Sequence, residues 1–327
     1  MPRPRRREFL VVGGALLAAI GTRGLAQTSQ RAVVGFLSSN APTRSTHAQF
    51  FRQSLRVLGW VEGRNLTIES RFSDRQETLR ELASELARLK VDVIVASSAL
   101  TTEAAKHATR SIPIVALTVL DPVEAGFAQS LAKPGGNITG VLYADPAFYA
   151  KTLQLMKETN PSMKKVGWLY PTAFPGIESY LRAAEAAGRE MGVTVYLLPV
   201  ARPEDVDAAL ATARKEGIDA FRITTGGVLV TAESRVREFA AVNKLLDAWA
   251  QPSYVERGGF MSYSPKASDS AARGAGLVDR ILKGAKPAEL PFEYPTRTEL
   301  VLNLKAARQR GIIVPQSVLF RADRVIE

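Results

Sequence analysis

From residue 31 onward, short apolar runs rich in β-branched residues alternate with segments of helical spacing, and this alternation constrains the fold more than any other feature. The first runs cover 32–37, 66–72, 91–96 and 114–118, with helices expected over 46–58, 78–89 and 101–109. The segment 78–89 places Leu79, Leu82 and Leu86 on one helix face. Because each crossover helix returns the chain to start another parallel strand, the pattern predicts an α/β fold with a doubly wound parallel sheet.

After Gly140 the alternation restarts. Apolar runs cover 166–171, 193–198 and 220–225, with helices expected over 177–191 and 205–216. The last third adds a run at 258–265, a helix over 268–283 and a final strand and helix over 299–310. This last third of the chain is long enough to contribute to both lobes if the chain crosses back between them. We therefore predict two Rossmann-like lobes, the first formed by 31–140 plus 256–288 and the second by 141–255 plus 289–327.

Residues 1–26 have the features of an export signal. Arg5, Arg6 and Arg7 precede an apolar run over Phe9–Ile20, and the small residues up to Ala26 suit a cleavage site. The run Arg6-Arg7-Glu8-Phe9-Leu10 is similar to the twin-arginine motif. The apolar run is shorter than the roughly 20 residues that span a bilayer. We therefore expect cleavage near Ala26 and a soluble periplasmic protein.

Charge and cysteine usage narrow the choice of partners. Loss of residues 1–26 would remove five arginines and one glutamate, and so lower the net charge from +11 to +7. The remaining basic residues are scattered among acidic ones, so nucleic acid is not expected as a partner. The chain has no cysteine, which excludes disulfides, thiolate metal sites and a cysteine nucleophile.

The residues that follow each predicted strand are the candidates for ligand binding, because open parallel sheets bind ligands at the carboxyl ends of their strands. Hydroxyls and one carboxylate dominate these positions. Ser and Thr are also common helix caps, so either role is open for each residue. We expect Ser38, Ser39, Ser97, Ser98, Thr118 and Asp121 to line the first wall of a cleft, and Tyr170, Thr172 and Thr225 to line the second, with Tyr263 as a further ligand-binding residue.

Catalytic signatures are absent from the sequence. It has no G-x-G-x-x-G, Walker loop, H-E-x-x-H or G-x-S-x-G motif. His47 and His107 fall on separate predicted helices, where a surface or capping role is the better interpretation. Asp121 could serve as a general base or as a helix cap before Pro122. We expect no metal, no cofactor and no enzymatic activity.

Several longer segments carry a resemblance to a known family. They are 58–66, 112–115, 121–123, 131–140, 258–263, 281–291 and 299–307, of which LAKPGGNITG and KGAKPAELP are the most specific. Together they resemble the exported substrate-binding proteins of ABC transporters, in the subfamily related to tryptophan- and tyrosine-binding components. The resemblance implies a type I periplasmic-binding fold, with two lobes joined by three crossovers and a ligand held between them.

Two departures from the family pattern concern the second wall. The segment 245–255 is shorter than in relatives, and Thr225-Gly226-Gly227 stands where relatives more often have an Asp-Pro pair. An aromatic amino acid is therefore not assumed as the ligand.

The expected function is capture of a small organic ligand, of amino-acid or small-carboxylate class, by hinge closure. An ABC permease would be the partner, and the binding protein would act as a monomer. Two alternatives stay open: an exported isomerase or hydrolase that uses Asp121, and a ligand-sensing protein of the same fold.

Overall fold

The computed structural model describes residues 31–41, 45–73, 75–145, 147–224, 226 and 228–327, and Arg31–Glu327 forms one compact unit. The predicted export signal lies outside the described residues. Within these ranges, no helix has both the length and the apolar character needed to cross a bilayer.

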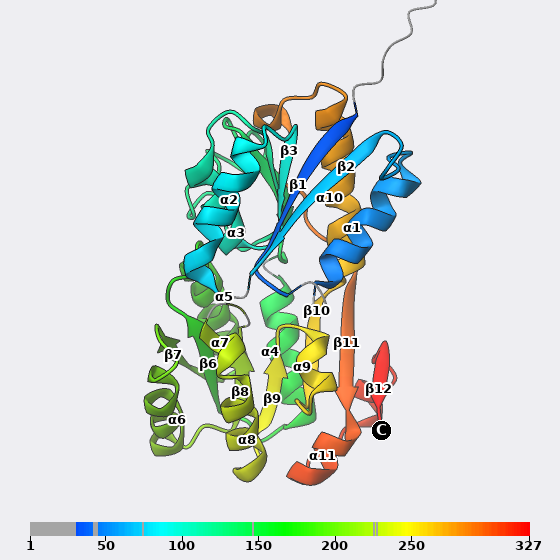
Figure 1. Ribbon diagram of the computed structural model, residues 1–327. Coiled ribbons are helices and arrows are strands. Elements are labelled where there is room, and N and C mark those ends of the chain that lie inside the picture. The colour runs from blue at the N-terminus through cyan, green and yellow to red at the C-terminus, as the bar shows by residue number, and fades with distance from the viewer. Residues whose placement is uncertain (1–30, 42–44, 74, 146, 225, 227) are drawn as a thin grey trace, which may run out of the picture. The chain divides into compact units, whose positions relative to one another are not determined.

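The first lobe is built on a five-stranded parallel sheet with the strand order β2-β1-β3-β4-β5 (Figure 1). Its strands are β1 (Ala32–Ser38), β2 (Leu66–Phe72), β3 (Val93–Ala96), β4 (Ile114–Val119) and β5 (Ile138–Leu142). Its helices are α1 (Thr46–Val57), α2 (Leu79–Arg88), α3 (Ala99–Ala108) and α10 (Ala267–Leu282), with 3₁₀ turns η2 (Gln76–Thr78) and η3 (Pro287–Glu289).

Helices cover both faces of the first sheet because its strands are apolar on both sides. Val34 and Phe36 of β1 pack under α1 and α10, whereas Leu37 faces the core formed with α2 and α3. This division follows the period of two in strand side chains. Gly274 of α10 lies so close to β4 that an added Cβ would come 2.1 Å from Leu117. That close approach explains a glycine in the middle of a helix.

The second lobe contains a seven-stranded sheet with the order β12-β11-β10-β9-β8-β6-β7, in which only β10 and β11 pair antiparallel. Its strands are β6 (Lys165–Pro171), β7 (Thr194–Val200), β8 (Ala220–Ile223), β9 (Leu246–Trp249), β10 (Met261–Pro265), β11 (Thr298–Asn303) and β12 (Arg324–Ile326). Its helices are α4 (Ala147–Thr159), α5 (Ile177–Glu190), α6 (Asp205–Glu216), α7 (Val228–Thr231), α8 (Glu233–Val242), α9 (Pro252–Glu256), α11 (Leu304–Arg310) and α12 (Gln316–Leu319). The segment 245–255, expected to be shortened, forms β9 and most of α9.

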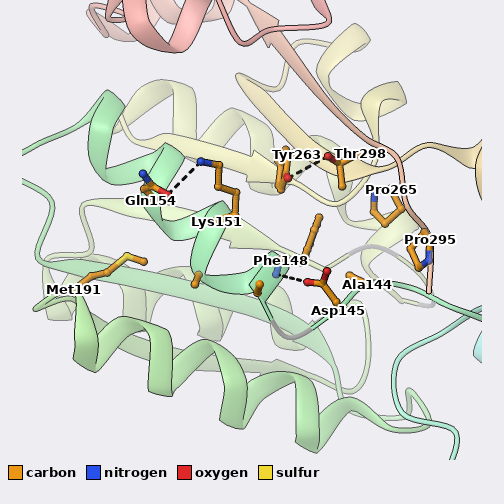
Figure 2. A pocket seen from close by; sticks show the side chains of 12 residues that line it. Ala144, Asp145, Phe148, Lys151, Gln154, Met191, Tyr263, Pro265, Pro295 and Thr298 are labelled. Carbon is orange, nitrogen blue, oxygen red and sulfur yellow. Dashed lines mark hydrogen bonds between the residues drawn. The ribbon is translucent and has the colours of Figure 1, made fainter. Parts of the chain in front are cut away.

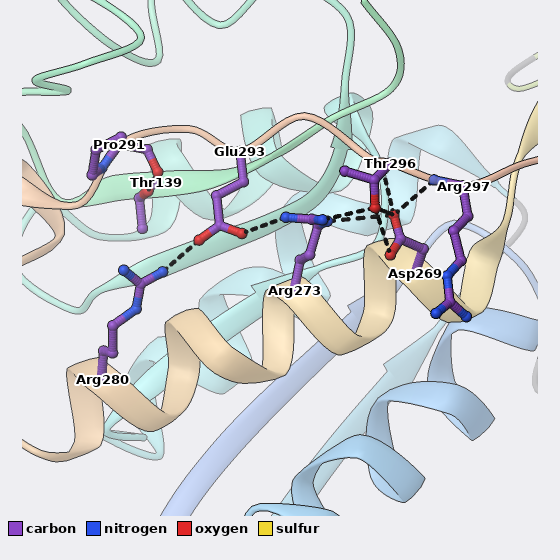
Figure 3. Close-up of polar contacts among 8 residues, drawn as sticks. All are labelled: Thr139, Asp269, Arg273, Arg280, Pro291, Glu293, Thr296 and Arg297. Atoms are coloured by element: carbon purple, nitrogen blue, oxygen red, sulfur yellow. Dashed lines mark hydrogen bonds and ion pairs between the residues drawn. The ribbon is translucent and has the colours of Figure 1, made fainter.

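The chain passes between the sheets three times: after β5, at Lys266 and in the segment that leads to β11. Figure 3 shows how α10 holds the third crossover. Glu293 accepts hydrogen bonds from Arg273 and Arg280, at 3.2 and 2.5 Å, and Asp269 accepts one from the Thr296 N–H at 2.7 Å. These contacts join the crossover to the first lobe up to residue 296.

Two lobe boundaries differ from the sequence expectation. Residues 256–288 were assigned to the first lobe, but β10 pairs with β9 and β11 in the second sheet. The chain therefore crosses to the first lobe at Lys266. Residues 292 and 293 also bond to the first lobe, through Leu131 and Gly140, rather than to the second. Both differences arise from backbone hydrogen bonds that the local pattern does not reveal: β10 pairs with β9 and β11, and residues 292 and 293 bond to Leu131 and Gly140.

Candidate functional site

A cavity of about 490 Å³ lies where residues from both lobes meet. The first lobe contributes residues that follow the carboxyl ends of β1, β3 and β4, and the start of α1. The second contributes aromatic and hydroxyl side chains from α5, from the ends of β8 and β10, and from α9. This position agrees with the general rule for ligand sites in open α/β sheets.

Serines form the centre of the first wall. The hydroxyls of Ser39 and Ser98 lie 3.0 Å apart, and the Ser39 N–H donates to Ser97 Oγ at 3.4 Å. Ser98 is also the N-cap of α3 and forms a capping box with Thr101. The two roles left open by the sequence, cap and cavity lining, therefore coincide in Ser98. The N-terminus of α3 presents its partial positive charge at this wall.

Ser38 lies one position behind the wall and is fully buried. Its hydroxyl lies 3.3 Å from that of Ser45 and accepts a hydrogen bond from the Asn40 N–H. It does not line the cavity, because the strand directs it toward the start of α1. Its contacts shape the turn after β1.

His47 lines the cavity from the first turn of α1, although the sequence indicated a surface or capping role. Its Nε2 lies 3.5 Å from Thr118 Oγ1, a predicted site residue that also lines the cavity. Burial lowers the pKa of His47 to about 4, because charging a desolvated imidazole is unfavourable. The ring is therefore neutral at neutral pH. The sequence signal for this role is the position of His47 at the start of the first helix after β1.

The second wall combines aromatic rings with hydroxyls. Tyr143, Phe174, Tyr180, Thr224 and Ser264 line the cavity. The Tyr143 hydroxyl donates to the Ala250 carbonyl at 3.2 Å, and the buried hydroxyls of Tyr180, Thr224 and Ser264 have no hydrogen-bond partner in the described structure. Thr224 lies at this wall; the predicted site residue Thr225 falls outside the described residues.

Charged side chains border the cavity at α9, β11 and β12. Glu256 forms an ion pair with Arg324 at 2.7 Å, and Lys266 pairs with Asp323 at 2.9 Å. Glu299 also lines the cavity, and desolvation raises its pKa despite the nearby Arg324 and Lys266.

Besides Ser38, four predicted site residues lie outside this cavity. Asp121 accepts hydrogen bonds from the N–H groups of Val123 and Glu124 and from the Ser179 hydroxyl, at 2.9, 3.0 and 2.9 Å. Its carboxylate thus closes a local turn and joins the two lobes. Asp121 is the residue that the enzyme alternative would use as its base, and it does not line the cavity.

The remaining three lie on the second lobe. Tyr170 packs against the core of that lobe, and burial raises its pKa. Thr172 is exposed and bonds through its N–H to Val200. Tyr263 lines a different pocket, of about 370 Å³, beside the crossovers. Figure 2 shows Tyr263 next to Thr298, whose hydroxyl donates to it at 3.1 Å; the Tyr263 ring stacks on Phe148 at 5.1 Å.

Comparison with known proteins assigns the chain to a family. The family model for ABC transporter substrate binding proteins matches residues 32–326. A curated tyrosine-binding protein of Clostridioides difficile strain R20291 is 27% identical over 256 residues, which are 77% of this chain and 73% of the relative.

Two solved structures share the fold closely. A conserved domain protein from Vibrio cholerae is 26% identical with a TM-score of 0.83, and the match covers 90% of this chain and 99% of that one. The ABC domain in complex with L-Trp from Streptococcus pneumoniae is 24% identical with a TM-score of 0.83, over 90% and 100% of the two chains. These likenesses establish the two-lobed type I periplasmic-binding fold. Together with the family match over nearly all of the described chain, they show that this protein belongs to the ABC transporter substrate-binding proteins, a family of binding proteins rather than enzymes.

Proposed function

We propose that this protein captures a small organic ligand, of amino-acid or small-carboxylate class, between its two lobes by hinge closure. The cavity carries the proposal, because hydroxyls from both lobes face one space of about 490 Å³. That volume lies within the range of about 300–1,000 Å³ that is usual for small-molecule sites. The relatives that bind tyrosine and L-Trp support the amino-acid class.

The closing motion follows from the connectivity. Three crossovers join the lobes, so rotation about them brings the first wall, with its serines, toward the second wall, with its aromatic rings. A ligand that contacts both walls gains interactions only in the closed form, and so shifts the population toward closure. An ABC permease would then recognise the closed monomer.

We further propose that residues 1–26 direct export to the periplasm and are cleaved near Ala26. The paired arginines and the short apolar run support this assignment. The N-terminal residue of protein recovered from the periplasm would test it, and retention of the full-length chain in the cytoplasm would contradict it. An Arg6→Lys, Arg7→Lys double variant should block export if the twin-arginine route is used.

Ligand binding is tested with the chain from Gln27 onward, after unfolding and refolding to remove copurified ligand. A thermal-shift screen would cover amino acids, aromatic acids, small carboxylates, nucleosides and sugars. A bound ligand stabilises the folded state by mass action, about 2.7 kcal/mol at a hundredfold excess over Kd. We expect a response confined to amino acids or carboxylates. No response from folded protein would contradict the proposed function.

A further inference from the structure

Arg222 on β8 is fully buried, yet much of its guanidinium has no partner. Its Nη1 donates to the carbonyls of Ile223 and Ala248 at 2.9 and 3.3 Å. Its Nε and Nη2 find no hydrogen-bond acceptor among the described residues. Arginine is almost never fully buried unless it is paired, because an uncompensated charge in a protein interior is unfavourable.

Among the described residues, Arg310 is the other buried arginine, and its charge is compensated by a carboxylate. Its guanidinium pairs with the fully buried carboxylate of Asp247: Nε lies 3.2 Å from Oδ1, and Nη2 donates to Oδ2 at 3.3 Å. No salt bridge in the described part of the chain involves Arg222. None of the described carboxylates therefore completes Arg222.

Neutral rings surround the Arg222 guanidinium. Trp168 lies below it, with its ring centroid 5.9 Å from the guanidinium carbon. The phenol groups of Tyr143, Tyr149 and Tyr180 lie near enough to interact with its charge. Burial raises the pKa of Tyr143 and Tyr149, so these phenols stay protonated and do not neutralise the charge.

Arg222 lies directly behind the second wall of the cavity. Tyr143, which lies near Arg222, lines the cavity, as do Tyr180, Thr224 and Ser264. The last three present buried hydroxyls without partners. A buried cation and free hydroxyl donors on one wall form a set complementary to an anion, since donors to charged acceptors make the stronger hydrogen bonds. We call Tyr143, Tyr180, Arg222, Thr224 and Ser264 the Arg222 wall.

The carboxylates of the cavity do not fill this role. Glu256 is paired with Arg324, and Glu299 on β11 faces Lys266 and Arg324. Among the described residues, neither glutamate forms an ion pair with Arg222.

We propose that the ligand is an organic acid whose carboxylate is received at the Arg222 wall, through the hydroxyls of that wall with the charge of Arg222 behind them. This inference rests on the proposed function and narrows its ligand class. Arg222 acts as a positioning residue, because Tyr143 and Tyr180 stand between it and the cavity. The serines of the first wall, at the start of α3, would contact the part of the ligand that does not carry this carboxylate.

Matched carboxylate and carboxamide probes test the inference, since each pair differs in charge but little in shape. The pairs are phenylacetate with phenylacetamide, 4-hydroxybenzoate with 4-hydroxybenzamide, L-tryptophan with L-tryptophanamide, and L-tyrosine with L-tyrosinamide. Titration calorimetry on the chain from Gln27 onward, which contains the whole compact unit, gives Kd for each. We expect at least one acid to bind about tenfold or more tightly than its amide.

An Arg222→Met variant separates this wall from any other anion site. We expect it to lose the preference for the acid, to within about twofold, while the amide binds as before. Its unliganded thermal midpoint should not fall, because an apolar side chain replaces an unpaired buried charge. Trp168→Phe is the matched control: it removes a neighbouring ring nitrogen but keeps the charge, and should keep the preference. If Arg222→Met fails to fold, Tyr180→Phe combined with Thr224→Val provides the same comparison.

Two results would overturn the inference alone: binding of acids and amides with equal affinity, or an acid preference that persists in folded Arg222→Met. In both cases a ligand still binds, and the proposed function stands. Absence of binding by every probe and by every class in the thermal-shift screen would overturn the proposed function and the inference together.

Discussion

The carboxylate of Glu124 in the first lobe accepts a hydrogen bond from the backbone N–H of Ser179 in the second lobe, at 3.2 Å. It also accepts one from the Glu178 N–H at 3.0 Å and pairs with Arg182 at 2.7 Å. Helix α5 begins at Ile177, so a carboxylate from one lobe caps the positive end of a helix in the other. We call this set of contacts the Glu124 contact.

The Glu124 contact should favour the arrangement in which both walls border the cavity. Glu124→Gln keeps the shape of the side chain but removes its charge. We expect weaker binding of the ligand found in the thermal-shift screen, by about fivefold, because an exposed ion pair contributes up to about 1 kcal/mol. Calorimetry measures Kd, and small-angle scattering measures the radius of gyration. Glu190→Gln, at the far end of α5, is the control and should leave both unchanged.

The same contact should weaken in acid. Burial alone would raise the pKa of Glu124, but hydrogen bonds from Ser179, Glu178 and Arg182 outweigh it and lower the pKa to about 2. A carboxylate with a lowered folded-state pKa stabilises above its unfolded value and loses that effect as pH falls through the folded value. The difference in unfolding free energy between the native protein and Glu124→Gln should therefore shrink from about pH 4.5 to about pH 2. A difference that does not change with pH would contradict the assignment.

Gly176 should be sensitive to any side chain. Its φ is +76°, and an added Cβ would come 2.6 Å from the Asp121 carbonyl of the other lobe. We expect Gly176→Ala to lower both the thermal midpoint and ligand affinity, because it strains the backbone and separates the lobes. Gly192→Ala is a close control, with φ of +64° and no atom within 4 Å of the added Cβ. It should lower the midpoint by backbone strain and leave Kd unchanged.

Ser97 and Ser98 should contribute directly to binding. A Ser97→Ala, Ser98→Ala double variant should weaken binding by about tenfold, since each lost hydrogen bond contributes about 1 kcal/mol. It should also lower stability by about 1 kcal/mol, because Ser98 caps α3. Thr101→Val breaks the same capping box from a buried position outside the cavity, and so reports the stability effect alone. Unchanged affinity in the double variant would show that the first wall is wrongly assigned.

His47 should make folding stability depend on pH in the mildly acidic range. Its folded-state pKa, about 4, lies below the unfolded value of about 6.5, so the unfolded chain binds more protons between these values. Stability therefore rises with pH through this window and falls as pH drops from about 6.5 toward 4. His47→Gln should remove this part of the slope, and denaturant unfolding at several pH values measures it. An NMR titration that finds His47 charged at pH 6 would contradict the prediction.

The alternation of apolar runs and helical segments predicted the α/β fold and nearly every strand and helix of the first lobe. It did so because side-chain period, capping residues and β-branched runs act within a few residues. The same local rules predicted that Ser39, Ser97, Ser98 and Thr118 follow strand ends, and all four line the cavity. Their part in binding stays a prediction.

Only the tertiary structure decided strand pairing, contacts between the lobes and the burial of particular side chains. The sequence predicts a strand at β10 but does not show which sheet it joins. Its pairing with β9 and β11 places it in the second lobe. Asp121 follows a strand end, as the cavity-lining serines do. Its carboxylate nevertheless accepts a hydrogen bond from Ser179, 58 positions away in the other lobe. Arg222 looks like a surface charge within a short strand until the packing of Trp168 and Tyr180 buries it. Spacing in a sequence specifies the elements, whereas burial, pairing and the meeting of two walls depend on contacts between residues that only the folded chain brings together.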